Sequence, residues 1–283
     1  MKSFVTNATI TQREAPDGLE TAANLEPMGK TGSLSRAARI LRAVAAGGQK
    51  GVSAADIVRA TGLPRPTVYR VMQMLEELGW LERAEGSRRV FLGSDLALLG
   101  LSASHRHSLD LVAGDILDSL SLEIGQTIYL SVRSGDDAVC VARVESGAQI
   151  RTLVLEVGSR HPLGLGAGSM ALLAAQSDNE IAAIVARNMP RFRTRPSFDE
   201  AAFNRALTLA REGRHASHQG LFTHGVSGIG VAVRDDSGHP AAAISAAFIT
   251  GWLDTAQLEQ CTFKMEQAAQ AVASRLALAA PRD

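Results

Sequence analysis

Residues 53–78 read SAADIVRATGLPRPTVYRVMQMLEEL and decide how the first third of the chain folds. Ser53 stands where an N-cap belongs, and Asp56 follows three residues later as its partner in a capping box, so a helix begins here. Gly62 interrupts the helical pattern, because glycine adopts the left-handed backbone that ends a helix. Pro64 and Pro66 fall in the first turn of the next helix, where a missing N–H costs little. The stretch predicts two helices joined by a tight turn.

The second of these helices has an apolar stripe and a polar face. The stripe recurs at steps of three and four residues and consists of Val68, Val71, Met72, Leu75 and Leu78. Other side chains lie at the helix start or off the stripe, and the candidates for DNA contact are Arg65, Thr67, Tyr69, Arg70 and Gln73. In a helix-turn-helix this end enters the major groove, where arginine reads guanine and hydroxyl groups hold phosphate. An ordinary helical hairpin is the alternative.

The flanking segments favour a winged helix-turn-helix over that alternative. Residues 33–45 repeat apolar side chains at helical spacing, with Arg36 off the apolar face as a further candidate for DNA contact. Residues 80–83 and 88–92 are short strand patterns around a turn that contains glycine. Arg88 and Arg89 follow the turn and are expected to contact phosphates. Three helices followed by an arginine-bearing hairpin make a plain helical hairpin the weaker interpretation.

The composition indicates a globular, cytoplasmic protein. The chain has 283 residues, which is room for two domains, with 46% hydrophobic and 20% charged residues. Its net charge is zero, but residues 33–95 carry ten positive side chains against six negative ones, so a basic field is local to this segment. We find no signal pattern and no run long enough to span a membrane. Cys140 and Cys261 lack metal-type spacing; buried free thiols are favoured, with a disulfide as the alternative.

Several runs of this sequence resemble the IclR-type bacterial transcriptional regulators. In the first third these are SLSRAARILRAV (33–44), TGLPRPTVYRVMQMLEELGWLER (61–83) and VFLGSDLALLG (90–100). Further along they are ARVES (142–146), VGSRHPL (157–163) and VAVRDDSGHPAAAIS (231–245). Because these runs occur in one order along almost the whole chain, the resemblance is more specific than any single motif.

The resemblance implies an α+β protein with a winged helix-turn-helix, a linker helix and a C-terminal effector-binding domain related to the GAF fold. Alternating strand patterns with helices at both ends agree with one antiparallel sheet; they occupy residues 126–133, 138–145, 226–234 and 240–248, with another near 150–154. The expected division is a disordered tail at 1–30, a DNA-binding domain at 31–93, a linker helix at 94–107 and an effector-binding domain at 108–283.

Residues 161–169, HPLGLGAGS, are a candidate ligand loop. Their glycines do not follow the dinucleotide fingerprint, and no βαβ unit with a ribose-binding acid comes after them. A helix predicted near 171–175 would leave N–H groups free at the end of the loop, which favours a carboxylate. The resemblance implies that this loop lines the effector pocket, with the candidates Gly164, Leu165, Gly166, Ala167, Gly168 and Ser169.

The resemblance assigns two further strands to the pocket, through Val226 and Gly228 in one and Ser245 and Ala247 in the next. Relatives that bind small 2-oxo acids typically carry a cysteine in place of Gly228 and a serine in place of Ala247. They also carry an aspartate near Ser217 or His218. Without these groups the pocket is expected to be larger and less polar, and to take an aromatic or other ring-derived acid.

Other side chains are expected at the walls and the mouth of this pocket. Apolar walls are expected from Leu130, Leu163, Leu165 and Val226. His218 is expected at the mouth, where it would pair with the carboxylate of the effector. His215, His218 and His224 do not make a zinc pattern, because no cysteine or spaced carboxylate accompanies them. Neither a metal nor a cofactor is expected.

Enzyme signatures are weak in this chain. It has no G-x-S-x-G elbow, and no cysteine–histidine or paired-carboxylate arrangement stands out. The expected function is a regulator, repressor or activator, whose binding to operator DNA is controlled by a small-molecule effector. One such module buries too little surface for tight binding, so a homodimer is expected; the resemblance further suggests a dimer of dimers. The rival hypothesis is an enzyme or metabolite-binding protein in which the first domain only mediates oligomerisation.

Overall fold

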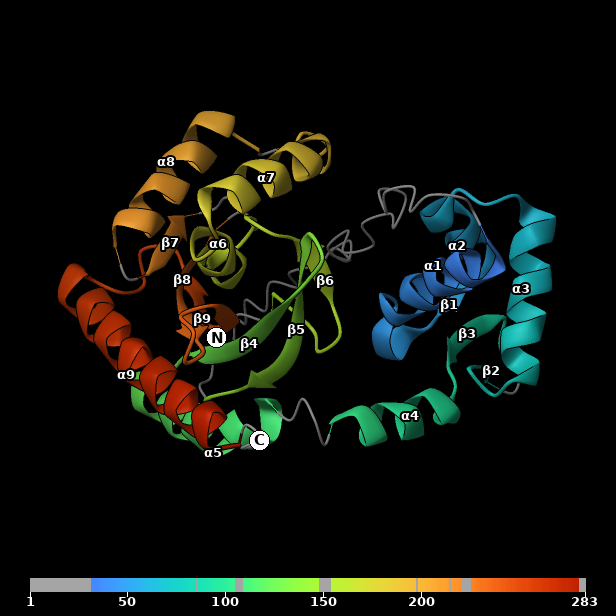
Figure 1. Ribbon diagram of the computed structural model, residues 1–283, viewed down its shortest axis with the longest axis horizontal. Helices are drawn as coiled ribbons and strands as arrows, with labels where there is room; N and C mark the ends of the chain where they lie inside the picture. Colours follow the sequence, from blue (N-terminus) through green and yellow to red (C-terminus); the bar gives the residue numbers. More distant parts are fainter. Residues whose placement is uncertain are drawn as a thin grey trace, which may run out of the picture.

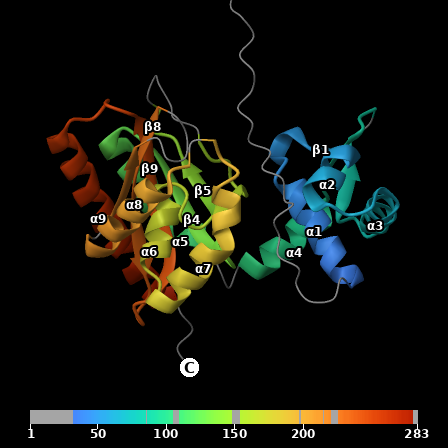
Figure 2. The ribbon, with the colours of Figure 1, turned by 90° about the horizontal axis from the view of Figure 1, so that it is seen from above.

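The computed structural model describes residues 32–84, 86–104, 109–147, 154–196, 198–213, 215–219 and 225–279. The expected tail at 1–30 and nearly all of the expected strand at 150–154 lie outside these ranges. The described residues form two lobes, with the helix α4 (Ser94–Ser104) between them (Figures 1 and 2). Within these ranges no helix is both long enough and apolar enough to cross a bilayer.

The first lobe is the predicted winged helix-turn-helix. Its helical elements are α1 (Ser33–Ala45), η2 (Gly48–Lys50), α2 (Ala54–Thr61) and α3 (Arg65–Glu77). Its strands are β1 (Val52–Ser53), β2 (Leu81–Arg83) and β3 (Arg89–Leu92), which form an antiparallel sheet in the order β1-β3-β2. The sheet packs with the three helices around one core, whose fully buried side chains include Ile40, Ile57 and Val90.

Local signals in the sequence set the geometry between α2 and α3. The Ser53 side chain accepts from the backbone N–H of Asp56, whose carboxylate accepts from the Ser53 N–H at 3.2 Å, so the capping box is present. Gly62 ends α2 with φ of 62°, in the left-handed region. Along α3 the expected stripe is buried at Val68, Met72 and Leu75. It is wrong at Leu78, which is 55% exposed because α3 ends at Glu77.

The second lobe is built on a six-stranded antiparallel sheet with the order β6-β5-β4-β9-β8-β7. The strands are β4 (Thr127–Ser134), β5 (Asp137–Val144), β6 (Arg160–Pro162), β7 (Ala216–Gln219), β8 (Val226–Arg234) and β9 (Pro240–Ile249). The helices are α5 (Leu109–Ile124), α6 (Ala167–Ala174), α7 (Asp178–Phe192), α8 (Glu200–Glu212) and α9 (Thr255–Ala279). This mixture of helices with one antiparallel sheet confirms the predicted α+β class.

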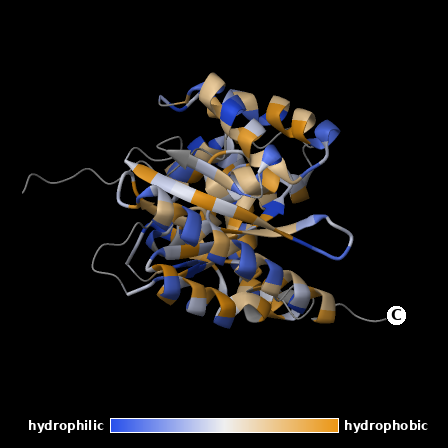
Figure 3. Ribbon diagram, turned by 90° about the vertical axis from the view of Figure 1, so that its left-hand side faces the viewer, coloured by the Kyte–Doolittle hydropathy of each residue, from blue (hydrophilic) through white to orange (hydrophobic). Residues whose placement is uncertain are grey.

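The two faces of this sheet carry different cores. On one face α5 and α9 pack against Ile128, Leu130 and Ile244. On the other face α6, α7 and α8 enclose a second core that contains Phe192 and Phe203. Neighbouring residues of a strand point to opposite faces, so Tyr129 and Ser245 lie on the α6 side. Figure 3 shows the strands between helices whose residues alternate between hydrophobic and hydrophilic.

Candidate functional site

A cavity opens on the α6 side of the six-stranded sheet. Its empty volume is about 440 Å³ out to the open mouth. The cavity is lined by the start of α6, by the strands β4, β8 and β9, and by Val154 and Leu155, which pack against Tyr129 and Ala247. The residues that line it are Tyr129, Ser131, Val154, Leu155, His161, Gly166, Ala167, Gly168, Ser169, Val226, Ser227, Gly228, Ser245, Ala246 and Ala247. The cavity therefore joins segments that are far apart in the sequence.

Two glycines allow the N-terminus of α6 to lie directly on the sheet. A Cβ atom at Gly230 would stand 2.2 Å from the backbone oxygen of Ala167, and one at Gly168 would stand 2.8 Å from Ser245 Oγ. The first intrahelical bond of α6 runs from the N–H of Met170 to the oxygen of Gly166, at 2.8 Å. The preceding N–H groups have no helical acceptor, so they give this end of the cavity a partial positive charge.

Two buried hydroxyl groups are open to a ligand in this cavity. Ser131 is 1% exposed and Ser245 is 6% exposed, and neither side chain makes a hydrogen bond to the described part of the chain. The hydroxyl of Ser169 is different. It accepts from the N–H of Gly164 and donates to the oxygen of Pro162, each at 2.9 Å, and so holds the loop before α6. Because buried hydroxyls gain by pairing, Ser131 and Ser245 can receive a polar ligand group.

Tyr129 and His161 add two aromatic groups to the cavity. The Tyr129 hydroxyl accepts a hydrogen bond from the N–H of Val154 at 3.1 Å, which ties the segment that contains Val154 to β4. Burial raises the pKa of Tyr129. His161 is 4% exposed, and burial lowers its pKa to about 4, with Arg195 and Arg191 acting in the same direction. The imidazole is therefore neutral at pH 7.

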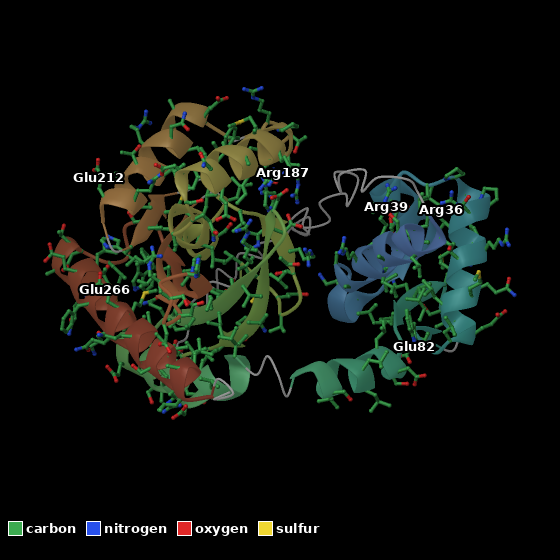
Figure 4. The ribbon with its side chains drawn as sticks, in the orientation of Figure 1. Arg36, Arg39, Glu82, Arg187, Glu212 and Glu266 are labelled. Atoms are coloured by element: carbon green, nitrogen blue, oxygen red, sulfur yellow. The ribbon has the colours of Figure 1, made fainter. Side chains whose placement is uncertain are left out.

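An ion-pair network holds β6, and with it His161, against the turn between β4 and β5. Asp137 is buried between Arg160, at 3.3 Å, and Arg191, at 2.6 Å. Arg187 donates to both carboxylate oxygens of Asp136, at 2.6 and 2.7 Å, and holds the pKa of that carboxyl below its ordinary value. Figure 4 shows Arg187 on α7, at the side where this turn lies. These contacts fix one wall of the cavity.

The structure brings most of the expected effector residues together. Eight of them line the cavity: Gly166, Ala167, Gly168, Ser169, Val226, Gly228, Ser245 and Ala247. Gly164 and Leu165 do not, because they turn into the core beneath α8: a Cβ atom at Gly164 would stand 2.7 Å from Phe203. His218 pairs with Gly228 through its backbone, but its side chain and all of His224 lie outside the described structure.

The expected apolar walls were mostly wrong. Leu130 points to the opposite face of the sheet, against α5 and α9, and Leu163 belongs with Leu165 to the core under α6. Only Val226 of the four lines the cavity. Tyr129 and Ser131 were missed, although they alternate with Ile128 and Leu130 in the pattern of β4. His161 begins the candidate loop 161–169 but was not among its named candidates. The cavity is thus more polar than expected.

Cys140 and Cys261 are buried free thiols, and the described residues contain no metal-binding cluster.

The exposed face of α3 carries the expected DNA-contacting side chains. The Arg65 guanidinium lies over the Tyr69 ring, 5.5 Å from its centroid, and its Nη2 donates to the Tyr69 hydroxyl at 3.4 Å. Gln73 donates to Glu77 at 3.1 Å. Arg70 is exposed and pairs with no group among the described residues. Thr67 is half-buried beside them. Arg70 is therefore available to a partner, and Arg65 is held by Tyr69.

The two arginines of the wing are placed differently. Arg88 is exposed. Nη1 of Arg89 donates to the backbone oxygens of Lys50 and Gly51, at 3.1 and 2.9 Å, and so joins β3 to the loop after η2. Arg36 and Arg39 project from α1 near the start of α3 (Figure 4). Arg39 donates to the backbone oxygen of Thr61. Of these four arginines, Arg36 and Arg88 are therefore the two with no hydrogen bond or ion pair to the described residues.

Both lobes match family models. The description "Bacterial transcriptional regulator IclR C-terminal" covers residues 101–274, and "IclR helix-turn-helix domain" covers residues 33–85. The HTH-type transcriptional repressor AllR of Salmonella paratyphi A is 28% identical over 224 residues, 78% of this chain and 81% of that protein. The HTH-type transcriptional regulator KipR of Bacillus subtilis is 30% identical over 130 residues, 46% and 51% of the two chains.

Solved structures share the fold. An IclR transcriptional regulator from Alicyclobacillus acidocaldarius has a TM-score of 0.71 at 21% identity and covers 87% of this chain and 99% of its own. An IclR homolog from Microbacterium hydrocarbonoxydans, complexed with 4-hydroxybenzoate, has a TM-score of 0.69 at 23% identity, with coverage of 87% and 99%. The IclR C-terminal model alone spans more than half of the 283 residues. The chain, with a helix-turn-helix that binds DNA and a domain that binds an effector, belongs to the IclR family of bacterial transcriptional regulators.

Proposed function

We propose that this regulator binds operator DNA as a homodimer or a dimer of dimers, and that a carboxylate effector bound at the N-terminus of α6 controls that binding. In this proposal residues 31–93 bind DNA and residues 108–283 bind the effector. Residues 94–107 form the linker helix between these two domains. The effector is an aromatic or other ring-derived acid. The single observation that carries the proposal is the pair of buried hydroxyls, Ser131 and Ser245, in one cavity with the free N–H groups of α6.

The donors of the cavity suit a carboxylate. An ionised carboxylate accepts several hydrogen bonds and donates none. The start of α6 supplies backbone N–H groups and a partial positive charge, and Ser245 lies against Gly168 in its first turn. A carboxylate placed there would accept from the N–H groups and from the serine, and would relieve the cost of leaving that hydroxyl unpaired.

The rest of the cavity suits a ring. Val154, Leu155, Val226 and Ala247 contribute apolar surface, and ligand pockets typically combine such surface with a few placed polar groups. The neutral imidazole of His161 adds a polar group to the lining. The 4-hydroxybenzoate complex of the Microbacterium hydrocarbonoxydans homolog supports this class of ligand.

A thermal-shift panel tests the effector class. The panel contains benzoate, 4-hydroxybenzoate and phenylacetate against glyoxylate and pyruvate. A ligand at a hundred times its dissociation constant adds about 2.7 kcal/mol to stability, so the ring acids should raise the melting temperature. Ser245→Ala and Ser131→Ala should lose the shift, whereas Ser274→Ala, an exposed control on α9, should keep it. If only glyoxylate or pyruvate stabilises the protein, the proposed ligand class is wrong.

For DNA, we propose that α3 reads the major groove and that the wing holds the backbone. Arg65, Thr67, Tyr69, Arg70 and Gln73 form the recognition surface, with Arg70 as the base-reading side chain because it is exposed and uncommitted. Arg88 and Arg36 contact phosphates. Arg89 contributes by fixing β3 to the loop at Lys50 and Gly51, which sets the position of the wing.

The proposed dimer uses α4. Three leucines of α4, Leu98, Leu99 and Leu101, are exposed in the single chain, and exposed apolar clusters of this kind mark protein–protein contacts. Pairing α4 helices would hold two recognition helices at a fixed spacing. Light scattering should report a dimer or larger for the wild type and a smaller species for Leu99→Lys. A monomeric wild type would exclude this arrangement.

A further inference from the structure

The outer edge of the six-stranded sheet is only half covered. The edge strand β7 pairs with β8 at residues 227–230 and no further. Residues 231–234 of β8 pair with β9 on one side and have no described strand on the other. Every second residue among these four directs its backbone N–H and C=O away from β9. These groups face a groove with an empty volume of about 1080 Å³. An open edge inside a groove is a place where an extended chain can add a strand.

The walls of the groove are lined with small side chains. Ala171 and Ala174 come from α6, Ala175 follows that helix, and Ala210 comes from α8. Ala269 and Ala273 come from α9 on the opposite wall. Arg234, His215 and Arg211 contribute basic side chains, of which Arg211 also pairs with Asp178 outside the lining. Glu266 of α9, which Figure 4 labels, is the one carboxylate within the described lining. A strand inserted between these walls would need side chains of small to medium size, followed by acidic residues.

We propose that residues 4–11 of this chain, FVTNATIT, dock in this groove as an additional strand beside residues 231–234 of β8. Five of these eight residues are β-branched, which favours an extended strand. Thr6, Ala8 and Ile10 would face one wall, and Val5, Asn7 and Thr9 would face the other. These side chains are small or medium in size, which suits the alanine-lined wall on each side of the groove.

Charge and length both suit this occupant. Glu14, Asp17 and Glu20 follow the segment and complement the basic groups of the groove. Twenty residues lie between Gln12 and Ser33, where α1 begins. An extended chain of that length reaches roughly 66–72 Å. The docked strand would attach the segment before the DNA-binding lobe to the effector-binding lobe. This proposal does not depend on which effector the cavity binds.

Hydrogen–deuterium exchange of the full chain tests the docking. The backbone amides within residues 231–234 should exchange roughly tenfold or more slowly in the full chain than in a chain lacking residues 2–12, because a docked strand protects edge amides. The same loss of protection is expected for the full-length double variant Thr6→Pro/Thr9→Pro, since proline lacks the N–H of a strand. The matched control Thr6→Val/Thr9→Val keeps the β-branched pattern and should retain the protection.

A synthetic peptide of residues 2–13 provides a second test of the docking. Added to the truncated chain, it should restore the protection of residues 231–234, and the peptide with the two prolines should not. Amides of α5, on the sheet's far side from α6, should exchange equally in all forms, which shows that each variant is folded. Equal exchange of residues 231–234 in the full, truncated and proline chains would overturn the proposal and leave the basic edge solvated.

Discussion

The buried histidine of the effector cavity makes a prediction about stability and pH. His161 has a pKa of about 4 in the folded chain, against an ordinary value of 6.5. The pKa is lowered, so the unfolded chain binds the proton more tightly between these values, and stability falls as the pH falls from 6.5 toward 4. Binding of this proton by the unfolded chain lowers the free energy of unfolding by about 3 kcal/mol over the whole interval. About 2 kcal/mol of this is lost by pH 5.

Carboxyl groups whose pKa is lowered lose their contribution to folding stability at a lower pH than His161 does. Asp56 and Asp136 have pKa values lowered from 3.8, so what they contribute is lost mainly as the pH falls below that value. The interval from pH 7 to pH 5 therefore reports on His161 with little interference from these carboxyls. The variant His161→Gln keeps a polar side chain at the cavity wall but cannot titrate in this range.

Urea unfolding at pH 7, 6 and 5 measures the effect. Between pH 7 and pH 5 the wild type should lose about 2 kcal/mol more free energy of unfolding than His161→Gln. The two proteins should have similar m-values, because the same surface is exposed on unfolding. A pH dependence that is identical in both proteins, or an imidazole that titrates near 6.5 by NMR, would refute the assignment of a buried neutral ring.

Further predictions concern the DNA surface and the packing beneath the cavity. Arg70→Ala should cost roughly 1–3 kcal/mol of operator binding in an anisotropy titration, and full affinity in a folded protein would remove it from base reading. Arg88→Ala should weaken operator and random DNA alike, with a salt slope smaller by about one; a loss at the operator alone would contradict a phosphate contact. Gly230→Ala should displace α6, because its Cβ would meet the Ala167 oxygen at 2.2 Å, and should abolish the effector-induced thermal shift. Ser53→Ala should cost about 0.5–2 kcal/mol in urea unfolding through the lost cap, and an unchanged midpoint would count against that role.

The first lobe could be predicted from sequence because its signals are local. A cap at Ser53, a left-handed glycine at Gly62 and an apolar stripe through Met72 each act within a few residues. The long strands β8 and β9 were predicted for the same reason, since each carries a regular pattern over nine or ten residues. The strands β1, β6 and β7 have only two to four residues and were not predicted. The strands β2 and β3 are as short, but the turn with Gly86 between them indicates a hairpin.

The cavity could be predicted only in part, because its composition depends on tertiary packing. The glycines before α6 and the residues Gly228, Ser245 and Ala247 were assigned to it through the family resemblance. Alternation along β4 separates Tyr129 from Leu130, but it does not say which face α6 covers, so Leu130 was placed on the wrong side. His161 enters the cavity because an ion-pair network draws β6 beside β5, and no local pattern indicates that pairing.

The most direct test of the account is one anisotropy titration of labelled DNA from the region upstream of the gene, with and without the acid that gives the largest thermal shift. We expect the acid to change the dissociation constant of the wild type by about 5- to 150-fold, the usual range of coupling between two sites. Ser245→Ala should bind the same DNA with unchanged affinity and show no response to the acid. A wild type that ignores the acid, or a Ser245→Ala protein that responds as the wild type does, would contradict control of DNA binding from the α6 cavity.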